Sequence, residues 1–411
     1  MALELTDIKF FKSKTVTDTP ENGGRMDETK EIVSGQKYNL FPRVSYTERI
    51  NGYTRYRKEF MANRNADNEI AYGALFCIIK PSNGGDRFYI RPGTQDDTQA
   101  DLSTDGWIGC GKLYTNVSAG ATQIQVEFEA DDYTIPNDVT LCIKDDTNLA
   151  WVKTANNQYT AEGLFIGDGI ATSFSGSLQH IPIIPTTLVI HYTIGGTNYT
   201  ATTDKSGNIT GDHISSGSVE AETGNWNLSF DTPPDDTTNV TADYTERCYT
   251  WSGNIATINL YDQVPNNYLA DNTYVGVCLE LGDLAPAKEN VQVTSPAGIF
   301  DGNYLSVNNV GTVYDTWTIT FTSATSFTCS GANEGSQANG SIDNVYGPIN
   351  PNTGQPYFFI ETAAWGGSWA AGDTVVFTTV PAARAIWWKE VIPAGTVREP
   401  QNEVVAEWFV E

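Results

Sequence analysis

Short runs of alternating apolar and polar residues recur along the whole chain and leave few folds open to it. Residues 123–128, 316–321 and 373–378 are clear examples of such runs. Alternation with a period of two places one face of a strand in a core and the other face in water. Turn residues separate the runs, as in the Ser-Asn-Gly-Gly sequence at 82–85 and the Ser-Gly-Asn sequence at 206–208. Short strands joined by such turns are typical of β-sandwiches and small barrels.

Helical periodicity, in contrast, is scarce. We predict one short helix, near residues 26–33, and find no strand–helix–strand unit of the kind that builds doubly wound nucleotide-binding folds. The predicted fold class is all-β, with several β-sandwich (Ig-like) and small β-barrel units in a multi-domain chain and one β-sandwich module inserted in another domain. The 411 residues exceed what one ordinary core holds, and 40% of them are apolar, which is enough for several cores.

Turn signals and composition divide the chain into four units. Residues 1–100 form an N-terminal β domain and a predicted docking region. Residues 101–158 and 248–288 form a second β unit that is split in the sequence. Residues 159–247 form an acidic β-sandwich module inserted into that second unit, and residues 289–411 form a C-terminal, Trp-rich β-sandwich. Such an insertion is well tolerated when the two ends of the module lie close together.

The charge of the chain is uneven. Its net charge is −26, but residues 1–100 hold 15 of the 24 Lys and Arg against 14 Asp and Glu. The acidic remainder should repel nucleic acid and anionic membranes, so we expect neither as a partner. The cations of the first quarter either cover solvated strand faces or dock on an acidic neighbour. The predicted contact residues are these cations and a pair of tryptophans near the C-terminus: Arg43, Arg49, Arg55, Arg57, Lys58, Arg64, Trp387 and Trp388.

The start of the sequence has no basic stretch followed by an apolar run, and no segment is apolar over the length of a membrane span. We therefore expect a chain that is made in a cytosol. Its six cysteines are dispersed and lack metal-binding spacing, so buried thiols are their expected state in a reducing compartment. Cys142 and Cys248 are the one pair that the predicted insertion could bring together as a disulfide.

Sequence motifs that carry chemistry are absent. There is no nucleophile elbow, zinc-peptidase helix or phosphate-binding loop, and the three histidines, His180, His191 and His213, all lie in the inserted module. Adjacent aspartates recur at 96–97, 131–132, 145–146 and 235–236. Such doublets serve as turn residues or as weak Ca²⁺ ligands, and neighbours on a strand point to opposite faces. We predict no catalytic residue, no cofactor and no metal site.

Tryptophans crowd the last unit, at Trp365, Trp369, Trp387 and Trp388. Adjacent residues of a strand face opposite sides, so one of Trp387 and Trp388 should enter the core. An exposed tryptophan would mark a subunit contact or a sugar-binding face. We rank a core role first, a subunit contact second and sugar binding third.

Several motifs of the chain carry a resemblance to known proteins. The stretch 167–244, with Gly-Asp-Gly at 167–169, the strand at 187–192 and Ala-Asp-Tyr at 242–244, resembles a small β-sandwich module found in phage tail, baseplate and fibre proteins. Most of the remaining chain resembles virion structural proteins of myovirus-like tailed bacteriophages. The elements that carry this second resemblance are Asn-Gly-Gly-Arg-Met at 22–26, Ile-Val-Ser-Gly at 32–35, Leu-Phe-Pro at 40–42, Thr-Arg-Tyr-Arg-Lys at 54–58, Gly-Thr-Gln at 93–95 and Ala-Trp-Gly-Gly at 364–367.

The resemblance implies a non-enzymatic structural component of a virion, with the tail, baseplate or neck region favoured. Its partners would be other virion structural proteins and further copies of itself. The chain would be made and assembled in the bacterial host cytoplasm. Two alternatives remain open. One is capsid decoration or binding of a host-surface glycan at the particle surface, and the other, which has less support, is a polysaccharide depolymerase with a pair of carboxylates in a cleft.

Overall fold

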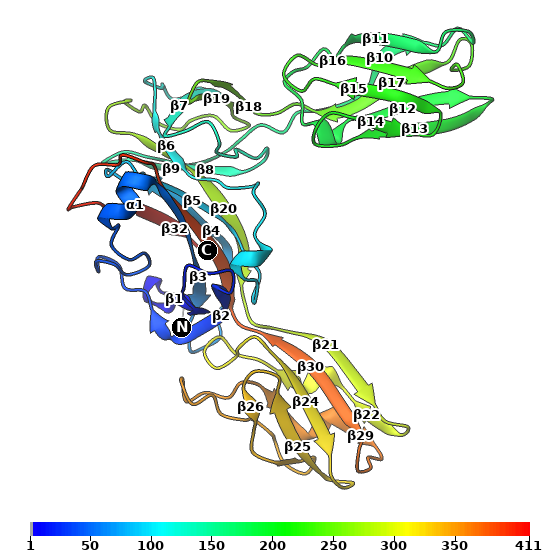
Figure 1. The fold of residues 1–411 in the computed structure, drawn as a ribbon. Helices are drawn as coiled ribbons and strands as arrows, with labels where there is room; N and C mark the ends of the chain where they lie inside the picture. The colour runs from blue at the N-terminus through cyan, green and yellow to red at the C-terminus, as the bar shows by residue number, and fades with distance from the viewer. Residues whose placement is uncertain (1–2) are drawn as a thin grey trace. The chain divides into compact units, whose positions relative to one another are not determined.

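The computed structural model describes residues 3–411 and confirms a multi-domain all-β chain (Figure 1). Two compact units divide it: the first runs up to Gly109 and resumes at Cys278, and the second is Cys110–Val277. Strand β20 (Tyr274–Leu284) passes from the second unit into the first. The sheets of the described residues are open, so the predicted small barrels are not formed.

The first unit begins with a β-sandwich whose main sheet is antiparallel throughout. Its strand order is β2 (Gly23–Glu31), β1 (Ile8–Thr15), β3 (Tyr53–Asn63), β31 (Ala383–Ile392) and β5 (Arg87–Pro92). Strand β4 (Ala71–Lys80) pairs with β20 and with β32 (Val405–Phe409). Aromatic side chains pack β4 on the main sheet: the ring centroid of Phe76 lies 5.8 Å from that of Phe10 and 5.9 Å from that of Trp388. Short 3₁₀ turns are η1 (Leu5–Asp7) and η2 (Gln99–Asp101).

The helix expected near residues 26–33 is wrong, because residues 23–31 form strand β2. Pairing with β1 and burial of Met26 and Asp27 outweigh the helical preference of Glu and Lys in this stretch. The α-helix of the described residues is α1 (Tyr46–Asn51) instead. Its start is a capping box: the Glu48 amide donates to Ser45 Oγ over 3.2 Å, and the Ser45 amide donates to Glu48 Oε2 over 2.5 Å. This Ser-x-x-Glu signal is readable in the sequence.

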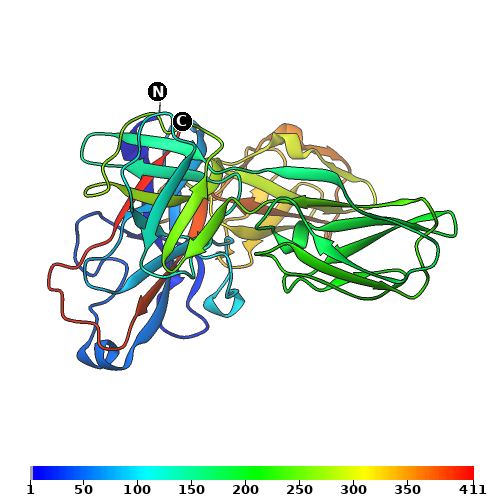
Figure 2. The same ribbon diagram turned by 90° about the horizontal axis from the view of Figure 1, so that it is seen from above.

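The predicted last unit, residues 289–411, differs from the observed one. A sandwich of residues 287–380 is inserted between β20 and β31, and the residues after it return to the N-terminal sheet (Figures 1 and 2). Its main sheet is β21 (Ala287–Thr294), β30 (Thr374–Val380), β24 (Asp315–Phe321), β25 (Ser326–Gly331) and β26 (Gly335–Ser336), with β27 (Gly340–Ser341) beside β25. Its first and last strands pair at Ala287 and Val380, which lets the chain leave and rejoin the first sandwich at one place.

Two short strand pairs and a dense aromatic core complete this sandwich. The pairs are β22 (Gly298–Phe300) with β29 (Trp365–Gly367), and β23 (Leu305–Ser306) with β28 (Phe359–Ile360), and the 3₁₀ turns are η4 (Gly302–Tyr304) and η5 (Thr362–Ala364). Trp317 is fully buried, and Trp369 stacks on Phe321 with ring centroids 4.3 Å apart. These tryptophans therefore build the core.

The second unit contains a small sheet and the inserted module. The sheet order is β18 (Tyr249–Ser252), β19 (Ile255–Asn259), β7 (Gln123–Phe128), β6 (Cys110–Leu113) and β20, and β8 (Thr140–Lys144) pairs with β20 and β9 (Leu149–Lys153). The predicted disulfide between Cys142 and Cys248 is not formed, as no cysteine of the described residues is disulfide bonded. The Cys248 sulfur lies 3.6 Å from the Pro136 carbonyl oxygen, and burial raises the pKa of this thiol to about 11.

The inserted module is a β-sandwich of its own (green in Figures 1 and 2). One sheet is β10 (Gln158–Ile166), β17 (Asn239–Thr245), β12 (Val189–Ile194), β13 (Thr197–Thr203) and β14 (Ile209–Gly211), and the other is β11 (Ser173–Ser177), β16 (Asn225–Phe230) and β15 (Ile214–Val219). A 3₁₀ turn, η3 (Pro185–Thr187), precedes β12. Gln158 pairs with Thr245, so the two ends of the module meet, as an insertion requires.

Candidate functional site

The predicted contact residues separate into a buried set and an accessible set. Arg55, Arg57 and Lys58 are 2%, 4% and 1% exposed, and Trp387 and Trp388 are buried with them. Arg64 is largely covered, with 11% of its side chain exposed. Of the eight residues, Arg43 is exposed and Arg49 is half-buried. The buried set holds the first unit together and does not offer a surface to a partner of the folded chain.

Arg55 stands at the centre of a buried ionic cluster. Its partner across the strands is Glu390 of β31, and Arg55 Nε lies 2.5 Å from Glu390 Oε2. Arg55 Nη1 lies 3.4 Å from Glu48 Oε1, so the cluster also holds α1. Burial raises the pKa of Glu390 to about 8, with Arg55 opposing the shift and the Asp86 carboxyl adding to it. Asp86 in turn accepts hydrogen bonds from Asn402 Nδ2 at 2.8 and 2.9 Å, which tie down the C-terminal segment.

On the other face of β3, Lys58 is enclosed by aromatic rings and oxygen atoms. Its Nζ lies 2.6 Å from Asp97 Oδ1 and donates to the Gly24 carbonyl oxygen over 2.8 Å. Trp387 Nε1 donates to the second oxygen of the same Asp97 carboxylate over 2.9 Å. Burial lowers the pKa of Lys58, and the hydrogen bond to Asp97 opposes the shift. These two interactions hold the loop that contains Asp97 against the main sheet.

Glu59 is a carboxyl group buried in the sandwich. Trp388 Nε1 donates to Glu59 Oε1 over 2.7 Å. Burial raises the pKa of Glu59 to about 7, although this hydrogen bond opposes the shift. The neighbouring Arg57 donates to Asp18 Oδ1 over 2.7 Å and to the Thr17 carbonyl oxygen over 2.9 Å. Trp387 and Trp388 point to opposite faces of the sheet, as predicted, and other parts of the chain cover both faces of the sheet.

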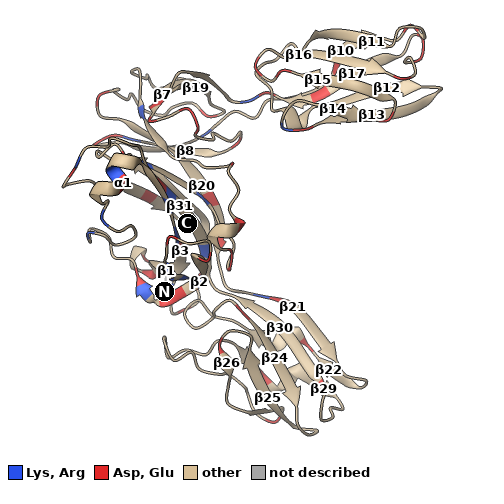
Figure 3. Ribbon diagram, viewed as in Figure 1, with Lys and Arg blue, Asp and Glu red and all other residues tan. Residues whose placement is uncertain are grey.

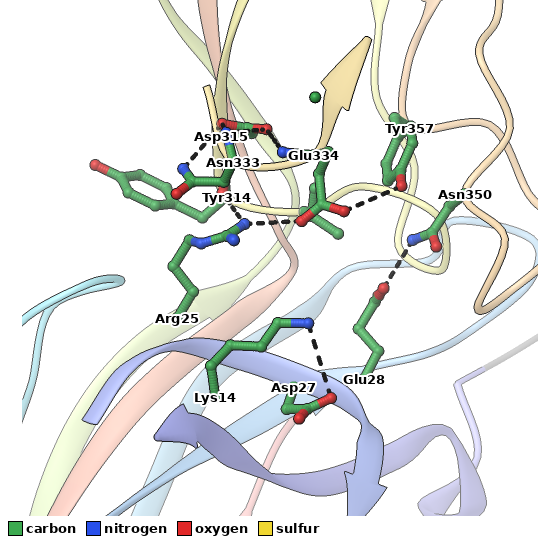
Figure 4. A network of polar contacts seen from close by, with 12 residues as sticks. Lys14, Arg25, Asp27, Glu28, Tyr314, Asp315, Asn333, Glu334, Asn350 and Tyr357 are labelled. Carbon is green, nitrogen blue, oxygen red and sulfur yellow. Dashed lines mark hydrogen bonds and ion pairs between the residues drawn. The ribbon is translucent and has the colours of Figure 1, made fainter. Parts of the chain in front are cut away.

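A second polar network joins β2 to the 287–380 sandwich (Figure 4). Arg25 Nη1 donates to Glu334 Oε1 over 2.9 Å and to the Tyr314 carbonyl oxygen over 3.2 Å. Tyr357 donates its hydroxyl proton to Glu334 Oε2 over 3.3 Å. Asp315 accepts the Glu334 amide over 2.8 Å, which holds the loop that carries Glu334. Arg25 and Glu334, whose side chains make this contact between β2 and the sandwich, are about 300 residues apart in the sequence.

Glu28 and Arg64 extend this network. Arg64 Nη2 donates to Glu28 Oε1 over 3.0 Å, and Asn350 Nδ2 donates to Glu28 Oε2 over 2.7 Å. Arg64 Nη1 also donates to the Val310 carbonyl oxygen over 2.7 Å. A pocket lined by Arg25 and Glu334, among others, has a volume of about 10 Å³, which is space for one water molecule. The network is therefore a structural junction, with no room there for a small-molecule substrate.

The accessible set lies in the segment of residues 33–53, which we call the α1 segment. Beside Arg43 and Arg49 it exposes five large apolar or aromatic side chains, and sequence reasoning missed all five: Val33, Tyr38, Tyr46, Ile50 and Tyr53. The spacing of residues 46, 49 and 50 places these three on one side of α1. The capping box at residues 45–48, together with this spacing, is the sequence signal that could have found them.

The remaining sequence candidates have structural roles. His191 pairs with Asp243 over 3.0 Å on adjacent strands of the module, and His213, in the turn between β14 and β15, pairs with Asp231 over 2.9 Å. Asp145 accepts the amide of Thr147 over 2.7 Å, so this member of an aspartate doublet forms a turn. Within residues 3–411, no group of three or more His, Cys, Asp or Glu side chains is arranged to hold a metal ion. Over the same residues, none of the helices has the length and apolar character to span a bilayer.

A scan against models of known protein families found no match, and a search of the curated proteins found none either.

Proposed function

We propose that the chain is a non-enzymatic structural component of a tailed-bacteriophage virion that acts through protein–protein contacts, with the tail, baseplate or neck region favoured. The observation that carries this proposal is the α1 segment. Tyr46 is 71% exposed and Ile50 is 50% exposed on the same helix face, next to Arg49. Tyr and Arg are enriched among the residues that dominate protein interfaces, and an exposed apolar helix face is stabilised when a partner covers it. The phage assignment itself follows from the sequence resemblance.

The buried ion pairs between the strands also favour a structural role over an enzymatic one. Buried ion pairs with good geometry fix one arrangement of strands at the expense of desolvation, and they provide no open cleft for a substrate. The carboxyl groups of Asp86 and Glu390 face each other as a hydrolase pair would, but both residues are 2% exposed and are engaged by Arg55 and Asn402. This burial weighs against the depolymerase alternative.

The glycan-binding alternative loses its best sequence support. Exposed tryptophan faces are the groups that stack on sugars, yet Trp369, Trp387 and Trp388 are 5%, 0% and 4% exposed. Their indole rings pack on aromatic neighbours inside the two sandwiches. We therefore prefer assembly to sugar recognition as the role of this chain.

The test is the composition of purified phage particles. Particles from a phage that encodes this chain would be banded in a density gradient, washed in high salt and analysed by quantitative mass spectrometry. We expect the chain at a fixed ratio to the major capsid protein, and we expect a nonsense mutation in its gene to yield incomplete particles. If the chain occurs in infected-cell lysates but not in washed particles, the proposal is wrong.

A further inference from the structure

The polarity of α1 is the reverse of that of an ordinary surface helix. A surface helix turns its apolar face to the core and its charges to water. Here Glu48 is drawn inward, since its carboxylate meets Arg55 Nη1 at 3.4 Å and the capping amide of Ser45 at 2.5 Å. Tyr46 and Ile50 lie on the opposite side and are 71% and 50% exposed. The fold therefore fixes an apolar helix face outward.

The charges around this face restrict what can cover it. The α1 segment has three cations, Lys37, Arg43 and Arg49, and one carboxylate, Glu48, which Arg55 already engages. Two copies of the segment placed face to face would bring like charges together. Like charges across an interface are costly, so the complementary surface must be acidic and must carry apolar side chains of its own.

The inserted module of this same chain has such a surface. Residues 158–246 contain eleven Asp and Glu but a single cation, Lys205 (Figure 3). At one end of the module, Ile166 and Ile170 are 65% and 83% exposed. The loop between them lies against residues 234–238: the Gly169 amide donates to the Pro234 carbonyl oxygen over 3.2 Å, and the Thr237 amide donates to the Gly167 carbonyl oxygen over 2.9 Å. We call residues 166–171 with 234–238 the module loops.

The module loops also contain three carboxylates, those of Asp168, Asp235 and Asp236. Asp168 lies between the two isoleucines in sequence, and Asp236 packs its Cβ near Gly169. Asp235 accepts the amides of Gly195 and Gly196 over 2.7 Å each, so its side chain is held in place. An exposed aliphatic pair on loops that carry three carboxylates is complementary to an exposed Tyr and Ile pair in a segment that carries Lys37, Arg43 and Arg49.

We propose that the α1 segment of one copy of this chain binds the module loops of a second copy. The contact joins two different surfaces, so each copy can both give and receive it, and copies associate head to tail into a ring or a filament. The proposal rests on the assembly function proposed above and names one partner of that assembly. Because opposite charges flank the apolar contact, added salt weakens the association.

The first test is isotope-coded cross-linking of the full-length chain. Equal amounts of ¹⁴N- and ¹⁵N-labelled chains are mixed and treated with a carbodiimide, which joins an amine to a carboxylate without a spacer. Lys37 supplies one amine, and the charge-preserving variant Arg49→Lys supplies a second on α1. We expect mixed-isotope products that join these positions to Asp168, Asp235 or Asp236. Products within single chains only, or links to Asp343, which lies beside the exposed apolar residue Val345 of the other sandwich, overturn the proposal.

The second test measures association by sedimentation velocity over a range of concentrations. Tyr46→Ser with Ile50→Ser, and separately Ile166→Ser with Ile170→Ser, should each weaken association at least tenfold, while combining the two pairs should add little. Tyr261→Ser with Leu269→Ser is the matched control, because these residues are also exposed, at 80% and 59%, but lie outside both surfaces. Thermal unfolding checks that each variant is folded.

Exchanging the charges of the two surfaces distinguishes a specific contact from non-specific association. Arg43→Glu with Arg49→Glu should abolish association, and adding Asp168→Lys with Asp236→Lys to the same chain should restore it. Failure of this rescue, in variants that remain folded, contradicts the pairing. A chain that is a fixed component of washed particles but shows no contact with its own copies would refute this inference and leave the proposed function standing.

Discussion

Two adjacent stretches of this chain both contain arginine and tyrosine, but their cations differ in solvent exposure. Residues 33–53 contain two Arg and three Tyr, and residues 55–64 contain three Arg and one Tyr. In the second stretch the cations are buried in the middle of a five-stranded sheet, whereas in the first they stay at the surface beside exposed aromatic side chains. The difference comes from what the chain places opposite them. Glu390 faces Arg55 across the sheet, and the Asp97 loop covers Lys58.

This contrast shows that arginine clusters cannot be assigned to interfaces by number alone. A buried cation is tolerated only where carboxylates and carbonyl oxygens satisfy it, and such a site stabilises one arrangement of strands. An exposed cation has little effect on the stability of the folded chain, and it contributes to binding when a complementary surface covers it. Charge reversal at Arg55 and Arg57, two of the contact residues predicted from the sequence, would therefore disturb folding before it tested assembly.

The largest effect expected is from Arg55→Ala, which leaves Glu390 and Glu48 without their cation. Removal of one partner of a buried pair costs about 3–5 kcal/mol, so we expect a loss of this size in the free energy of unfolding of the first sandwich. Hydrogen exchange of peptides from β3 and β31 reports this sheet separately from the other domains. Arg49→Ala is the control in the accessible stretch and should change stability by less than about 0.5 kcal/mol. Equal losses for the two variants would remove the distinction between the stretches.

A smaller effect is expected from the pH dependence of Glu59. Because burial raises its pKa from 4.5 to about 7, the folded chain keeps this proton at pH values where the unfolded chain has lost it. The stabilisation is therefore fully present below pH 4.5 and is lost as the pH rises to about 7. Between these limits the native chain should lose on the order of 3 kcal/mol relative to Glu59→Gln, which cannot release a proton.

The measurement for Glu59 is urea denaturation of both proteins across this pH range. Glu390 has a raised pKa as well, but it is present in both chains and cancels in the difference. Parallel stability curves for the native chain and the variant would show that Glu59 does not titrate as its burial implies.

The smallest effect concerns the junction between β2 and the 287–380 sandwich. Arg25 and Glu334 keep 18% and 20% of their side chains exposed, so solvent screens part of their attraction. A double-mutant cycle of Arg25→Ala and Glu334→Ala should give a coupling energy of about 1 kcal/mol. The surface pair Lys9 and Glu31, 40% and 44% exposed, is the matched control and should show no measurable coupling. A coupling equal to that of the control would mean that the network of Figure 4 is not what holds the junction.

Much of the local structure was readable from residue patterns. The alternating stretches at 123–128, 316–321 and 373–378 correspond to β7, β24 and β30 within one or two residues. Strands β10 and β17 fall at the two ends of the stretch predicted as an inserted module, since alternation and turn residues are local signals of strands. The capping box that starts α1 was also present in the sequence, although a six-residue helix has too little periodicity to stand out.

The amino-acid sequence by itself determined the all-β class, the strands, the buried cysteines and the charge asymmetry, because these follow from side-chain chemistry and a period of two. The tertiary structure alone decided that β31 returns to the N-terminal sheet, that residues 23–31 form a strand, and which arginines are buried. Arg55 and Glu390 are 335 residues apart, and only the pairing of β3 with β31 brings them together. No local pattern specifies such a pairing, since its stability comes from the partner strand and the layer packed upon it.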